Sequence, residues 1–170
     1  IMKHAAAEAL PTSSVAPSAD VLGDYWPGIQ IYYPPVKYAP ALGLYEDLEQ
    51  ASQRFKKHAW GTTAHTLIFD LEDGCRQKEM SRELLRRELP KMLRRKQVQV
   101  AVRINPFRTE EYEKDLKMVR DLSDHIDAVM LAKAGEAYGS PEIRDLSAVL
   151  VGLNHRITIQ PIIEHPKSLK

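Results

Sequence analysis

The 170-residue sequence has one cysteine, few aromatic residues and no excess of charge of either sign. A single cysteine, Cys75, cannot form an internal disulfide, so the fold does not depend on disulfides and suits a reducing compartment. The 24 Lys and Arg residues balance the 23 Asp and Glu residues. Net charge therefore gives no reason to expect a nucleic acid or an anionic membrane as a partner.

Long hydrophobic runs are also missing. No apolar stretch approaches the roughly 20 residues that a transmembrane helix needs, and the basic-then-apolar pattern of a secretion signal is absent from the first residues. We therefore expect a cytoplasmic protein without a membrane partner. Residues 1–27 are rich in Ala, Ser and Pro with little periodicity, so we expect them to form a flexible N-terminal arm. Residues 28–170 have the length of one domain.

Short apolar segments alternate with helical patterns along this domain. Five segments are expected to be strands, at residues 29–33, 66–69, 98–104, 128–131 and 157–163. Four helices are expected between them, on the apolar spacings at 44–55, 80–93, 112–122 and 143–153. Pro90 should kink the second helix. Thr109 and Ser140 are expected to cap the third and the fourth.

This alternation, at about 30 residues per unit, predicts an α/β fold with a parallel sheet. Two architectures fit it. One is a doubly wound sheet of five strands, and the other is the first five strands of an eight-stranded (β/α)8 TIM barrel. In the second case we expect the domain to be incomplete at its C-terminal end, with about 100 residues beyond Lys170. The strands alone do not choose between the two.

Charged and amide side chains stand at the C-terminal ends of the predicted strands. They are Asp70, Glu72, Asp73, Arg103, Asn105, Lys133 and Glu164. Because parallel strands place their carboxyl ends at one edge, we expect these side chains to face the same rim. Three carboxylates together could hold a hard divalent ion such as Mg²⁺. Arg103 offers a planar fork for a substrate carboxylate or a developing enolate.

Blander and rival interpretations fit parts of this pattern. Each single charge at a strand end is often a solvated loop residue, and Asp73-Gly74 alone could be a turn. Glu72 and Gly74 break the motif that a phosphatase of the haloacid dehalogenase type carries after its nucleophile, which argues against that enzyme class. A basic run could bind RNA or a CoA phosphate, although its acidic neighbours favour a solvated helix face. The run consists of Arg86, Arg87, Lys91, Arg94, Arg95 and Lys96.

Five motifs follow one another in a specific order. They are Phe69-Asp70-Leu71-Glu72-Asp73-Gly74, Lys78 with Arg82, Val102-Arg103-Ile104-Asn105, Met130-Leu131-Ala132-Lys133 and Ile162-Ile163-Glu164. Over about residues 28–170, this set resembles the citrate lyase β-subunit-like family of the HpcH/HpaI aldolase superfamily. The nearest functional relatives of that family are the malyl-CoA and citramalyl-CoA lyases.

The resemblance implies a (β/α)8 barrel that binds Mg²⁺ and cleaves a β-hydroxyacyl-CoA thioester. The substrate would be citramalyl-CoA, malyl-CoA or a citryl-type thioester, and the products would be acetyl-CoA and a keto acid. By the same resemblance Glu164 is the metal ligand, and the catalytic residues are Glu72, Asp73 and Arg103. A homotrimer is also implied.

Arg103 also belongs to the predicted substrate-binding residues, with Asn105 and Lys133. The sequence departs from the family pattern in three places. The family's Arg-Ser pair has no counterpart near Gly28 and Ile29, the loop after Asp73 is about two residues shorter, and a second metal-binding Asp would lie beyond Lys170. The alternative is therefore a catalytically weak or inactive subunit that acts as a binding or assembly partner.

Overall fold

A computed structural model of the chain describes residues 30–40, 43–59, 64–92, 98–134, 139–154 and 156–162. Its main feature is one sheet of five parallel strands, in which the spatial order of the strands follows the chain. The strands are β1 (Gln30–Tyr33), β4 (Thr66–Asp70), β5 (Gln99–Ile104), β6 (Ala128–Leu131) and β7 (Thr158–Pro161). The expected arm at residues 1–27 lies outside the described residues.

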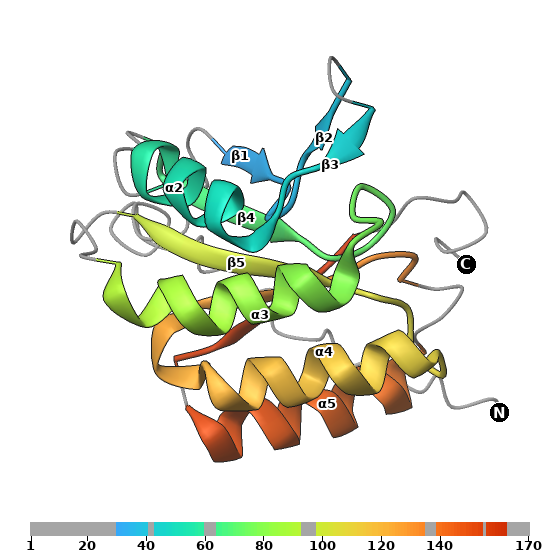
Figure 1. The fold of residues 1–170 in the computed structure, drawn as a ribbon. Coiled ribbons are helices and arrows are strands. Elements are labelled where there is room, and N and C mark those ends of the chain that lie inside the picture. Colours follow the sequence, from blue (N-terminus) through green and yellow to red (C-terminus); the bar gives the residue numbers. More distant parts are fainter. Residues whose placement is uncertain are drawn as a thin grey trace, which may run out of the picture.

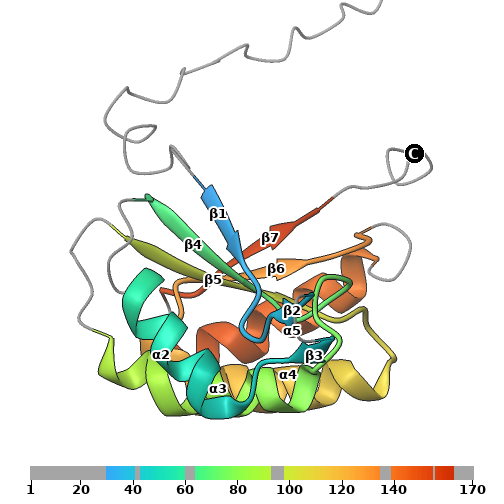
Figure 2. The ribbon, with the colours of Figure 1, turned by 45° about the horizontal axis from the view of Figure 1, so that its top comes forward.

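The four long helices in the described ranges lie on one face of this sheet (Figures 1 and 2). They are α2 (Leu48–His58), α3 (Lys78–Glu88), α4 (Glu110–Asp121) and α5 (Ser140–Leu153). A doubly wound sheet would carry helices on both faces and reverse its strand order. Sequential parallel strands with every helix outside are instead the wall of a (β/α) barrel. The barrel expectation is therefore confirmed over the described part, and the doubly wound alternative is wrong.

The main core lies between the sheet and the helices. All five residues of β4 are buried, as the sequence predicts for a central parallel strand. Phe69 points toward α2, where its ring stacks on Phe55 with centroids 5.3 Å apart. The opposite face of the sheet carries a smaller apolar cluster of Ile68, Ala101, Ala128 and Met130. Side chains alternate between these faces along each strand, so Asp70 and Arg103 belong to the second face.

The expected signals at two helix boundaries are confirmed. The side chain of Thr109 accepts a hydrogen bond from the backbone N–H of Tyr112 and so caps α4. Helix α3 ends at Glu88 and gives way to a 3₁₀ turn, η1 (Leu89–Lys91), at Pro90, where the missing N–H interrupts the α-helical pattern. A second 3₁₀ turn, η2 (Ser123–His125), follows α4.

The first helix begins later in the structure than the sequence predicts. Leu44 lies in a small antiparallel hairpin of β2 (Tyr38–Ala39) and β3 (Leu44–Tyr45), and it is 65% exposed. Helix α2 begins only at Leu48, because Asp47 and Gln50 form a capping box there. The Asp47 carboxylate accepts from the Gln50 N–H at 2.8 Å, and the Gln50 side chain accepts from the Asp47 N–H at 3.1 Å.

The fourth helix also differs in detail. Gly139, rather than Ser140, is the residue that precedes its first turn, and the Glu142 carboxylate accepts a hydrogen bond from the Gly139 N–H at 3.0 Å. Leu146 and Leu150 are buried as expected, whereas Leu153 at the last turn is 40% exposed. None of the helices in the described ranges combines the length and apolarity that crossing a membrane requires.

Candidate functional site

An ion pair joins the ends of β4 and β5. Asp70 and Arg103 are register partners, so their side chains leave the sheet on the same face. Nε of Arg103 donates to Oδ1 of Asp70 at 2.8 Å, and Nη2 donates to Oδ2 at 2.6 Å. The hydrogen bonds that Arg103 donates to Asp70 raise the pKa of Arg103 above its usual range. Both Asp70 oxygens are therefore engaged by a guanidinium, and a metal-binding role for Asp70 stays a prediction.

Glu72 follows β4 and is almost completely buried. Nζ of Lys133 lies 3.0 Å from its Oε1, and Nη1 of Arg103 lies 3.6 Å from its Oε2. Neither oxygen accepts an aligned hydrogen bond from the described residues, so these two contacts are ionic. A buried carboxylate is costly unless cations compensate it, and here two cations do so from neighbouring strand ends.

The rim of the sheet thus carries charges of alternating sign, from Asp70 through Arg103 and Glu72 to Lys133. Asp73 stands at the outer end of this row, with a side chain 76% exposed and its Oδ2 3.7 Å from Nζ of Lys133. The structure therefore brings together four of the predicted catalytic and substrate-binding residues at the ends of three adjacent strands. These four are Glu72, Asp73, Arg103 and Lys133. Their roles in a reaction stay predictions.

Lys133 has an unusual backbone. Its φ of 58° lies in the left-handed region, which costs a residue with a Cβ about 1 kcal/mol or more. A strained conformation persists only where the surroundings fix it, and such positions cluster at functional sites. In this case the conformation directs a cation from the end of β6 onto Glu72.

The side chain of Asn105, which is predicted to bind substrate, is hydrogen-bonded to other residues of the protein. Its Oδ1 accepts a hydrogen bond from Nζ of Lys78 at 2.6 Å. Its Nδ2 donates to the carbonyl of Leu71 at 2.8 Å and to Oδ2 of Asp115 at 2.6 Å. The side chain is buried and ties the end of β5 to the loop that follows β4. Substrate binding by Asn105 stays a prediction.

The described residues offer oxygen donors of the kind that bind Mg²⁺, but they do not form a complete metal site. The two Glu72 oxygens keep lone pairs that no aligned hydrogen bond uses, and carboxylate oxygens are the ligands that Mg²⁺ prefers. Within the described ranges, however, no group of three His, Cys, Asp or Glu side chains is placed to hold a metal ion. The predicted ligand Glu164 lies outside the described residues.

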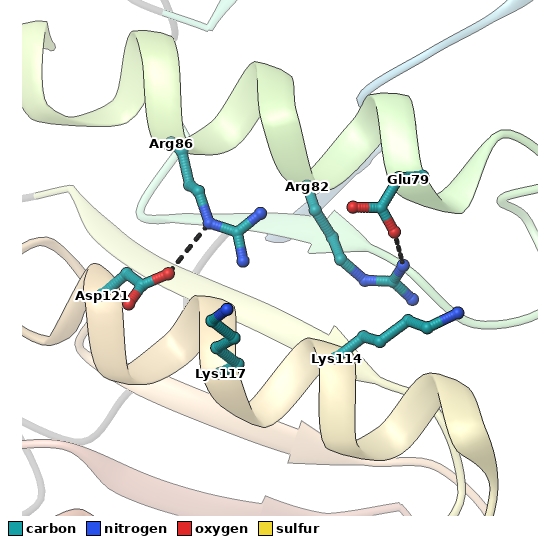
Figure 3. A pocket seen from close by; sticks show the side chains of 6 residues that line it. All are labelled: Glu79, Arg82, Arg86, Lys114, Lys117 and Asp121. Atoms are coloured by element: carbon teal, nitrogen blue, oxygen red, sulfur yellow. Dashed lines mark hydrogen bonds and ion pairs between the residues drawn. The ribbon is translucent and has the colours of Figure 1, made fainter.

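A second polar region lies on the outside of the barrel wall, between α3 and α4. This groove of about 440 Å³ is lined by Glu79, Arg82, Arg86, Lys114, Lys117 and Asp121 (Figure 3). Arg86 pairs with Asp121 at 2.9 Å. Of the other described members of the basic run, Arg87 pairs with Glu49 at 2.7 Å and Lys91 lies 3.6 Å from Glu88. These pairings favour the solvated helix face over an anion-binding surface. Residues 94–96 lie outside the described ranges.

Sequence reasoning missed one residue of the network around Asn105 and named two others only as motif members. Asp115 is fully buried, although no motif pointed to it. A signal was present, because Asp115 falls three residues after Tyr112 and therefore on the buried side of α4. A carboxylate on such a face needs a partner, and Nε of Arg82 provides one at 2.8 Å. Lys78, the other motif member, contacts the loop after β4.

Comparison with known proteins bears on this arrangement. The family model described as HpcH/HpaI aldolase/citrate lyase matches residues 43–139, more than half of the chain. The matched segment includes the whole row of charges at the rim, from Asp70 to Lys133. A search of curated proteins gave no match.

Proposed function

Because the chain belongs to the HpcH/HpaI aldolase/citrate lyase family, whose members cleave carbon–carbon bonds, we propose that it is a lyase of the citrate lyase β-subunit-like type. The proposed substrate is a β-hydroxyacyl-CoA thioester, such as citramalyl-CoA, malyl-CoA or a citryl-type thioester. The proposed products are acetyl-CoA and a keto acid. We also propose that the protein is a homotrimer and that it is located in the cytoplasm.

The observation that carries this proposal is the buried Glu72 carboxylate between two cations. Cleavage requires a base to take the proton from the β-hydroxyl group. The carbon–carbon bond then breaks, its electron pair passes to the thioester carbonyl, and the resulting enolate is protonated to acetyl-CoA. Glu72, with Asp73 beside it, supplies the carboxylates for proton transfer. Arg103 and Lys133 supply fixed positive charge next to the developing enolate.

Members of the family commonly use a divalent metal. In this proposal Glu164 would hold Mg²⁺, which when bound would polarise a carbonyl oxygen of the keto-acid half as a Lewis acid. The residues of the chain remain responsible for binding and for moving protons.

One observation favours the alternative of a weakly active subunit that serves as a binding or assembly partner. The fork of Arg103, predicted to bind a substrate carboxylate, is already engaged by Asp70 in a bidentate pair. A substrate carboxylate would have to use the remaining face of the guanidinium or displace Asp70. If neither happens readily, turnover is slow while the fold remains intact.

The test is release of acetyl-CoA from citramalyl-CoA, malyl-CoA and citryl-CoA, with Mg²⁺ and with EDTA. We expect activity on at least one thioester that is lost with EDTA and falls at least about 100-fold in Glu72→Gln, the scale of losing a proton-transfer group. Lys117→Met, on the exposed side of α4, is the matched control and keeps wild-type activity. A well-folded wild-type protein that cleaves none of the three would favour the subunit alternative. Light scattering checks the trimer.

A further inference from the structure

We propose that Lys78 is a positioning residue, whose ammonium group holds the loop after β4 so that the Glu72 carboxylate faces Lys133 and Arg103. Asn105 accepts a hydrogen bond from Lys78, and Asp115 in turn accepts a hydrogen bond from Asn105. This inference rests on the proposed function, because it concerns how Glu72 is presented for that reaction.

Lys78 donates three hydrogen bonds to the loop after β4 and to Asn105. Its Nζ donates to the carbonyl of Leu71 at 2.8 Å, to the carbonyl of Glu72 at 3.0 Å and to Oδ1 of Asn105 at 2.6 Å. An ammonium group has three hydrogens, and these three acceptors use all of them. Two of the acceptors are consecutive peptide carbonyls, so Lys78 fixes the orientation of the chain at the point where Glu72 leaves it.

The Glu72 side chain depends on this backbone support. Its oxygens accept no aligned hydrogen bond from the described residues, so its direction depends on the ionic contacts and on the backbone. The backbone of Glu72 is held both at its N–H and at its carbonyl. The N–H of Glu72 donates to Oδ1 of Asp70 at 3.0 Å, and its carbonyl accepts from Lys78 and from the N–H of Cys75 at 3.1 Å. Removing Lys78 would leave the Glu72 carbonyl with only its hydrogen bond from Cys75, and the Leu71 carbonyl with only its hydrogen bond from Asn105, among the described residues.

A buried network behind Lys78 makes its position rigid. Asp115 accepts two hydrogen bonds at Oδ2, from the N–H of Asn105 at 2.8 Å and from its Nδ2 at 2.6 Å. Its Oδ1 accepts from Nε of Arg82 at 2.8 Å. Asp115, Arg82 and Asn105 are all buried, so water competes little for these bonds. The network connects α3 and α4 to the loop that carries Glu72.

The single cysteine of the chain offers a direct probe of the loop. Cys75 closes the loop, is 2% exposed, and its Sγ lies 3.1 Å from Oγ of Ser81. A thiol reagent therefore reaches it only when the loop opens. We expect Lys78→Met, which keeps the aliphatic stem and removes the donors, to accelerate labelling of Cys75 about tenfold or more.

Two controls separate loop opening from loss of overall stability. Lys117→Met removes an exposed lysine of α4 and should label at the wild-type rate. Val119→Ala destabilises the core of α4 away from the loop, and its labelling rate gives the part that global unfolding contributes. The proposal is overturned if Lys78→Met labels no faster than Val119→Ala at a matched loss of melting temperature.

Kinetics then test whether the held loop matters to the reaction. Misplacing a reacting group lowers kcat, and loss of a supporting hydrogen bond commonly costs 10–100-fold. For Lys78→Met we expect kcat to fall about 10–100-fold with KM within about threefold, and Lys78→Arg, which keeps a cationic donor, to recover part of kcat. Unchanged kcat in a variant whose loop opens would overturn the positioning role. An inactive wild type would refute the proposed function, and the labelling rates would still decide whether Lys78 holds the loop.

Discussion

Gly74 lies so close to Asp70 that a Cβ at position 74 would stand 2.5 Å from Oδ2 of Asp70. That oxygen accepts the 2.6 Å hydrogen bond from Nη2 of Arg103. The absence of a side chain at Gly74 is therefore what allows the β4 loop to fold back over the ion pair.

The first prediction follows from this contact. Gly74→Ala should lower the free energy of unfolding by about 1–3 kcal/mol, because either the loop or the Asp70 carboxylate must move. Chemical unfolding of wild type and variant measures the change. Gly152→Ala is the matched control: nothing lies within 4 Å of a Cβ there, and the site is inside α5. It should stabilise the protein by up to about 1 kcal/mol. Equal effects of the two substitutions would contradict the contact.

Arg103→Lys tests the bidentate pair itself. Lysine keeps the charge but cannot place two parallel N–H groups on Asp70, so one of the two hydrogen bonds is lost. We expect a loss of about 1–3 kcal/mol in the free energy of unfolding. Asp70→Asn should give a loss of similar size, and the double variant should lose clearly less than the sum, because both substitutions break one interaction. Strict additivity of the two losses would show that the pair is not coupled.

The left-handed backbone of Lys133 gives a prediction with an unusual sign. Lys133→Gly and Lys133→Ala both remove the cation beside Glu72, but only glycine adopts a φ of 58° without strain. The glycine variant should therefore be more stable than the alanine variant by about 1 kcal/mol, measured by urea unfolding. Ala148→Gly, on the exposed side of α5, should show the opposite order, with glycine less stable by about 1 kcal/mol. Matching signs at both positions would speak against the strain.

Glu111 gives a pH-dependent prediction. A hydrogen bond from Arg82 lowers the pKa of Glu111 below its ordinary value of 4.5. Between the folded and unfolded pKa values the unfolded state binds more protons, so the stabilisation is fully present above pH 4.5. It is lost as the pH falls through the folded pKa.

The stability difference between wild type and Glu111→Gln should therefore be largest near pH 7 and shrink as the pH falls below the ordinary value of 4.5. Urea unfolding at each pH measures it. Glu113→Gln, on the exposed side of the same helix, should stay within about 0.5 kcal/mol of wild type throughout. A difference that grows toward acid would reverse the predicted sign.

Much of the fold could be predicted because burial imposes a periodic pattern on long elements. The segment at β4 is apolar at successive positions since both faces of the strand are covered, and the α4 face repeats every three or four residues since one side packs on the sheet. The β2–β3 hairpin was not predictable, because strands of two residues have no period. The exposed Leu153 shows that an apolar spacing near a helix end does not guarantee burial.

The candidate site was predictable as a set of residues but not as a set of contacts. A strand-end rule placed Glu72, Arg103 and Lys133 at one rim, since it depends only on where each strand stops. Which side chains pair depends on the register of strands more than 30 residues apart. No local pattern encodes that Arg103 engages Asp70, or that Asn105 turns inward to Lys78.

Lys78 holds the β4 loop by its peptide carbonyls rather than by its side chains. Every amino acid presents the same carbonyl, so the support does not depend on which side chain stands at positions 71 and 72. The side chain at position 72 can therefore be exchanged without removing the hydrogen bonds that hold the loop. The frame of the loop is thus encoded by Lys78 and not by the residue that the loop displays.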